Sequence, residues 1–324
     1  MKKFTQLALV SSLAISANAM AMQAMDDAAL SASTGQDGIN IGIGISKVQI
    51  DKLYIHDNDG LAADATNTYT PVSMLTGSPV PGAPVTTKIV GGTGKAGAIG
   101  IDGITITANY GAILSTTNLM DLQIDSDAGT GDKGAFLNIA AQVSGLDIKI
   151  GAISVSASND AASTGRRGVS ATNSNQILSG LNIKTGQMAA NIQLGSTPQG
   201  AMIKLDTSMK GGLEISDLGI LDNAGGGQVT LGKISLNDAN SADLSINADV
   251  SVTNKGLAIT SHQNEDGTDI YIQGINLGAA PAVALGDRGT ARAGSIGDVE
   301  IQGLKTFYGA GYANQGSVIT VSGR

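Results

Sequence analysis

A short phrase recurs along the chain and constrains its fold strongly. It consists of glycine, then Leu or Ile, then a residue that is polar in most copies, and then Ile or Leu. Copies begin at Gly103, Gly145, Gly180, Gly212, Gly256 and Gly274. Aliphatic residues two positions apart lie on one face of a strand, and glycine permits the tight corners between strands. The spacings of 42, 35, 32, 44 and 18 residues lack the fixed period of a strict solenoid. The phrase therefore predicts irregular strand–turn–strand units.

The composition agrees with an all-β chain. Its 324 residues include 45 glycines and no tryptophan, and 42% of them are hydrophobic, which is too high a fraction for a disordered chain. We expect an elongated β-solenoid-like or rolled-sheet architecture built from irregular strand–turn–strand repeats. A β-sandwich is the alternative, because short strands separated by turns satisfy it equally well.

The first strands are marked by a period of two. Ile39, Ile41, Ile43 and Ile45 alternate with small or polar residues. A second strand follows through Ile55, and its alternation slips at Asp51–Lys52, which is typical of a bulge or a corner.

The N-terminus predicts export. Lys2 and Lys3 precede a short apolar run, and Ala17 and Ala19 form an A-x-A cleavage site. We expect a signal peptide over 1–19, with cleavage after Ala21 as the other option. The protein would then reside in the periplasm, at the outer-membrane surface or in an extracellular filament.

The rest of the chain divides by composition. Residues 20–60 hold an N-terminal motif and the first strands, and 61–98 form a loop rich in Pro, Thr and Gly. Residues 99–324 form the body of β repeats. No stretch after the signal region reaches the roughly 20 apolar residues of a transmembrane helix, so we expect no transmembrane segment.

Charge and residue types exclude several function classes. The net charge of −8 and the pI near 4.6 argue against a nucleic-acid partner, because phosphates require clustered Lys and Arg. The only histidines, His56 and His262, stand beside acidic turns and read as loop residues, and no Gly-x-Ser-x-Gly elbow is present. We therefore expect no enzymatic activity.

Acidic turns supply the only candidate ligands for a cofactor, which would be calcium. Oxygen-rich clusters occur at Asp57 with Asp59, and at Asp125 with Asp127 and Asp132. Calcium takes six to eight oxygen ligands from flexible loops of this kind. Asp and Asn are also ordinary turn residues, so solvated turns explain the same pattern.

The segment Met25-Asp-Asp-Ala-Ala-Leu-Ser-Ala-Ser-Thr-Gly-Gln-Asp-Gly-Ile39 directly follows the expected signal peptide. It resembles the FilA-like family, which consists of exported Gram-negative proteins of a pilus system. The resemblance covers roughly residues 1–60 and includes the signal-peptide boundary. The resemblance implies a role in forming or assembling a surface filament. It carries no catalytic residues.

Two functions follow as expectations. The first is a non-enzymatic, exported structural or assembly component of a cell-surface pilus or filament, whose partners are other filament components or further copies joined by strand pairing. The alternative is a calcium-stabilised adhesin or matrix-binding protein.

Overall fold

The computed structural model describes residues 38–63, 66–69, 85–131, 134–160, 165–254, 256–279 and 294–321. The expected signal peptide over 1–19, the motif from Met25 to Asp37 and the candidate ligand Asp132 lie outside these residues. The chain separates into two compact units, Met1–Ile39 and Asn40–Arg324, and the second unit carries almost all of the structure described below.

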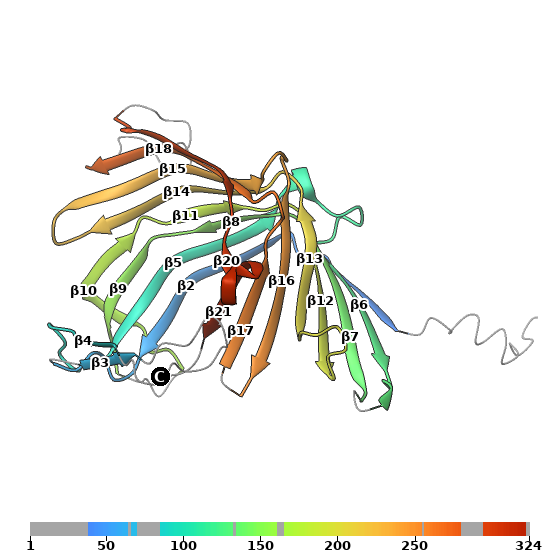
Figure 1. Cartoon of the computed structure of the whole chain (residues 1–324). Helices are drawn as coiled ribbons and strands as arrows, with labels where there is room; N and C mark the ends of the chain where they lie inside the picture. Colours follow the sequence, from blue (N-terminus) through green and yellow to red (C-terminus); the bar gives the residue numbers. More distant parts are fainter. Residues whose placement is uncertain are drawn as a thin grey trace, which may run out of the picture. The chain divides into compact units, whose positions relative to one another are not determined.

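The described residues form two large β-sheets and one small one (Figure 1). In spatial order, sheet A contains β1 (Ile39–Ile43), β6 (Met120–Asp127), β7 (Phe136–Val143), β12 (Met188–Gly195), β13 (Ile203–Met209), β16 (Leu244–Thr253), β17 (Gly256–His262), β21 (Asn314–Val321) and β20 (Phe307–Tyr308). Sheet B contains β10 (Val169–Leu178), β9 (Ile153–Ser158), β5 (Gly97–Ala108), β8 (Leu146–Ile150), β11 (Leu181–Lys184), β14 (Leu213–Asp222), β15 (Gly227–Asp238), β18 (Thr268–Gly278) and β19 (Gly297–Leu304), with β2 (Lys47–Asp57) paired to β5.

Short elements complete the described structure. β3 (Thr66–Tyr69) and β4 (Val85–Lys88) pair with each other inside the segment 61–98 that was expected to be a loop. Two 3₁₀ turns, η1 (Tyr110–Ala112) and η3 (Ala310–Tyr312), lie in connections between strands. No helix among the described ranges is long and apolar enough to cross a membrane.

The predicted all-β class is confirmed. The two large sheets fit the sandwich alternative, and the solenoid-like arrangement is not confirmed. Each of the strand pairs whose register is determined is antiparallel, for example β14 with β15 and β16 with β17, whereas a β-helical solenoid stacks parallel strands.

Both sheets grow in the same direction along the chain. After β2 and β5 in sheet B, the chain adds β6 and β7 to sheet A and returns to sheet B with β8, and this exchange continues until β21. Each new strand pair extends its sheet beside the preceding pair. The first strands therefore lie at one end of each sheet and the last strands at the other.

The ten strands of sheet B fill eight positions. β8 and β9 follow each other beside β5, and β10 and β11 follow each other beside β14. The positions are, in order, β2, β5, β8 with β9, β10 with β11, β14, β15, β18 and β19.

Pairing across sheet B is interrupted along one line, which we call the break line. It passes through Asp51, Gly103, Gly151–Ala152, Ser179–Gly180, Asp217, Gly232, Gly274 and Asp298. Gly103, Gly180 and Gly274 open three of the repeated phrases and have φ values of 86°, 103° and 67°. The slip predicted at Asp51–Lys52 belongs to the same line. These phrases therefore mark interruptions inside long strands, while the copy at Gly145 stands immediately before β8.

Aliphatic residues line up across each sheet as direct cross-strand partners. In sheet B the row is Val48, Ile106, Ile148, Ile183, Ile215, Ile234, Ile272 and Val299. In sheet A it is Ile124, Ile139, Ile192, Ile203, Val250, Ile259 and Ile319. Each such pair contributes roughly 0.2–1 kcal/mol, so the rows hold the strands in register.

The passages between the sheets bury small polar residues. Ser144 is fully buried, and its Oγ accepts from the backbone N–H of Leu114 at 2.9 Å and donates to the carbonyl oxygen of Asn118 at 2.6 Å. Asn109 donates from Nδ2 to the carbonyl oxygen of Thr185 at 2.9 Å. Buried groups of this kind need such partners, so these hydrogen bonds help to fix the crossings.

Candidate functional site

The predicted ligands Asp57 and Asp59 lie in one turn at the end of β2. The Oδ1 atom of Asp57 accepts from the backbone N–H groups of Asp59 and Gly60, each at 3.4 Å. This is the side-chain-to-backbone bonding that Asp makes in ordinary turns. The turn is exposed, and its geometry is explained without a bound ion.

Asp125 and Asp127 lie on β6 in sheet A, whereas Asp57 ends β2 of sheet B and Asp59 lies in the turn after it, so the two groups belong to different sheets. Asp127 accepts from the backbone N–H of Gly129 at 2.6 Å. Within the described part of the chain, no three His, Cys, Asp or Glu side chains gather in a way that could hold a metal ion.

Both histidines lie on strands, so the prediction that they are loop residues is wrong. His56 is on β2, and its Nδ1 is 2.5 Å from the Oγ of Ser158 on β9. His262 ends β17, and its Nε2 is 3.1 Å from Oδ2 of Asp249 on β16. The acidic residues next to them in the sequence are typical of turns. The strands extend as far as those turns, so both histidines belong to strands.

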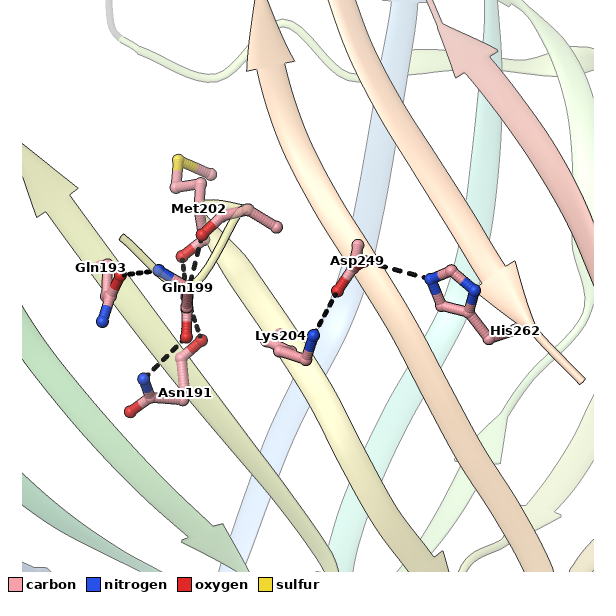
Figure 2. A network of polar contacts seen from close by, with 8 residues as sticks. Asn191, Gln193, Gln199, Met202, Lys204, Asp249 and His262 are labelled. Atoms are coloured by element: carbon pink, nitrogen blue, oxygen red, sulfur yellow. Dashed lines mark hydrogen bonds and ion pairs between the residues drawn. The ribbon is translucent and has the colours of Figure 1, made fainter. Parts of the chain in front are cut away.

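A network of polar side chains covers part of one face of sheet A (Figure 2). The Nζ atom of Lys204 lies 3.6 Å from Oδ1 of Asp249, and Oδ2 of Asp249 is hydrogen-bonded to Nε2 of His262. Alongside, Asn191 donates to Oε1 of Gln199 at 2.8 Å, and Gln193 accepts from the backbone N–H of Gln199 at 3.0 Å.

The network has a structural role. Gln199 stands in the β12–β13 turn and also donates to the carbonyl oxygens of Ala201 and Met202. Its amide thus ties the turn to β12. The neighbouring depression of about 490 Å³ is open, and Asp206, Asn247 and His262 are among its lining residues. Such an open surface can offer hydrogen bonds.

The ends of the two sheets form the more distinctive surface. Among the described strands, β2 pairs only with β5, and β19 pairs only with β18. In sheet A, β1 stands at one end, and at the other β20 pairs with only Asn314 and Gln315 of β21. Within the described ranges, both sheets therefore present open strand edges at both ends.

Aliphatic side chains are exposed on these end strands. Ile55 on β2 is 59% exposed, Val299 on β19 is 41% exposed, and Ile319 on β21 is 54% exposed. Natural edges are usually protected by charges, proline or a covering element. β1 and β21 contain no charged residue and no proline, so neither charge nor proline protects their edges.

Charges do occur on the edges of sheet B. Lys47 begins β2 and Glu300 lies within β19, and both side chains are exposed. No described residue forms an ion pair with either of them. We call β1, β2, β19 and β21 the end strands. The sequence did not single them out, because edge position depends on pairing between distant segments.

Comparisons with known proteins reach only the N-terminal part of the chain. The model of DUF6160, a family of unknown function, matches residues 1–77, which include β1, β2 and β3. No curated protein matches the chain, and no solved structure matches it. The matched family therefore assigns no activity to any residue named above.

Proposed function

We propose that this chain is an exported, non-enzymatic structural or assembly component of a cell-surface pilus or filament. In this proposal, copies of the chain, or other filament components, join by pairing strands at the open sheet edges. The expected signal peptide supplies the route to the surface.

One observation carries the proposal: among the strands that the structure describes, both sheets end in open, partly aliphatic edges at both ends of the strand order. An edge strand presents unpaired N–H and C=O groups, and a partner strand satisfies them while covering the aliphatic side chains. A protein with different pairing surfaces at its two ends assembles head to tail, and such contacts form open filaments unless they close into a ring.

The contacts of the polar network on sheet A are consistent with the same function. The network around Gln199 and Asp249 fixes strands and turns, and the depression beside it is open. The acidic net charge keeps the exported subunit soluble before it assembles.

Cells that make the protein and cells deleted for it provide the test. Immunogold labelling should decorate surface fibres of the first strain, and fibres of the deletion strain should be absent or altered. Unlabelled fibres together with unchanged fibres in the deletion strain would overturn the proposal.

A further inference from the structure

We infer that a second copy of this chain pairs antiparallel with sheet B, so that Gly297–Glu300 of β19 in one copy lie against Lys47–Ile50 of β2 in the next, with Glu300 opposite Lys47. This inference rests on the proposed function and specifies its contact.

The strand directions permit this joint. Neighbouring positions of sheet B alternate in direction, and the sheet has eight positions from β2 to β19. Because eight is even, β2 and β19 run in opposite directions. A copy added end to end therefore continues the antiparallel alternation without inversion.

The aliphatic row sets the register. It begins at Val48 on β2 and ends at Val299 on β19. Register in a sheet is fixed by its apolar pattern, because a slip of one residue moves every side chain to the other face. Continuing the row across the joint places Val299 opposite Val48 of the next copy, and this register places Glu300 opposite Lys47.

The charges of the adjacent row agree with that register. This row contains Lys47, Thr107, Asp147, Lys184, Glu214, Ser235, Tyr271 and Glu300 as direct cross-strand partners. Inside the sheet, Lys184 stands between Asp147 and Glu214, so opposite charges already face each other. The joint would add one more such pair, between the exposed Glu300 and the exposed Lys47.

The same charges disfavour pairing of two β19 edges. Two β19 strands would bring Asp298 and Glu300 of both copies together, and like charges on facing strands are destabilising. The acidic β19 edge thus favours the β2 edge, which begins with Lys47, over a second β19 edge.

Cysteine cross-linking tests the joint directly, because the native chain contains no cysteine. The purified protein with both Lys47→Cys and Glu300→Cys is oxidised and run on a non-reducing gel. Residues directly opposite in antiparallel strands have Cβ atoms about 4.5–5.5 Å apart, close to disulfide distance. Within one copy the two positions are seven strand spacings apart, roughly 34 Å along the sheet, so they cannot bridge internally.

The expected result is a ladder of dimers, trimers and longer chains that collapses on reduction. Each single-cysteine variant should form disulfide-linked dimers at most. The control pair Lys47→Cys with Asp206→Cys should give no ladder, because Asp206 lies on β13 inside sheet A.

Charge reversal tests the Lys47–Glu300 pair independently. Lys47→Glu and Glu300→Lys should each weaken self-association roughly 3- to 10-fold, and mixing the two variants should restore it, since each then meets the opposite charge. Lys149→Glu and Asp206→Lys, on inner strands, should leave association unchanged.

The outcomes separate this inference from the proposed function. The inferred joint would be overturned if the unaltered protein assembles but the Lys47/Glu300 cysteine pair gives no ladder. It would also be overturned if mixing the two charge-reversal variants does not restore association. Either result would leave the assembly role standing. Absence of any self-association would overturn self-pairing, including this joint.

Discussion

The Nδ2 atom of Asn182 on β11 donates to Oδ2 of Asp217 on β14 at 2.6 Å, directly at the break line of sheet B. Asp217 is 1% exposed and has a φ of 64°, a left-handed conformation that Asp and Asn tolerate better than other side chains. The pair thus joins a special backbone conformation to a buried hydrogen bond. Two neighbouring strands are held together where their regular pairing is interrupted.

Replacing Asp217 should therefore be costly. Asp217→Ala removes the acceptor and places alanine at a positive φ, and we expect it to lower the free energy of unfolding by about 2–4 kcal/mol. Asp217→Asn keeps the backbone preference and should cost less. Urea unfolding measures both changes. Asp206→Ala, an exposed change on β13, should stay within about 0.5 kcal/mol, and an equal loss in that control would contradict the assignment.

Gly145, which opens one of the repeated phrases, should not accept a methyl group. A Cβ there would lie 2.7 Å from both the Cβ of Ala112 and the carbonyl oxygen of Thr185. We expect Gly145→Ala to destabilise the protein by about 1–3 kcal/mol, because the passage between the sheets would have to shift. Gly227→Ala is the matched control, since its nearest neighbour would be 3.8 Å away. Thermal unfolding of both variants checks the prediction, and similar melting temperatures would refute it.

Acid should remove the contribution of Asp243. The Nζ of Lys210 and the backbone N–H of Gly211 both donate to its carboxylate and hold the pKa of Asp243 below its ordinary value of 3.8. The unfolded chain has the ordinary pKa, so the stabilisation is present above pH 3.8 and is lost as the pH falls through the lower folded-state pKa.

Asp243→Asn should accordingly be less stable than the native protein near neutral pH. The difference should shrink as the pH falls below 3.8. Urea midpoints across this range measure it, with Asp206→Asn as the control. A difference that stays constant with pH would contradict the role of the charged carboxylate.

Calcium offers a separate test, of the adhesin alternative. The carboxylates of Asp57 and Asp127 accept from backbone N–H groups of their own turns, so we expect EDTA to leave the melting temperature unchanged. An increase on adding calcium that EDTA reverses would favour the calcium-stabilised adhesin. Replacing Asp57, Asp59, Asp125, Asp127 and Asp132 in turn would then locate the ions.

The local pattern of this chain predicted much of the fold. Alternating isoleucines predicted β1, and the slip at Asp51–Lys52 predicted the interruption in β2, because both depend on neighbouring residues. The placement of Gly103 inside a strand and of Gly145 before one could not be predicted, since the same phrase suits both. Which strands pair with each other could not be predicted either. Lys47 and Glu300 become edge residues only through pairings between distant segments.

Sedimentation velocity of the purified protein over increasing concentration, with electron microscopy of the same samples, tests the central claim most directly. We predict large species that grow with concentration and appear as filaments. A protein that sediments as a single monomer at every concentration, alone and when mixed with the other components of its surface fibres, would contradict the assembly role.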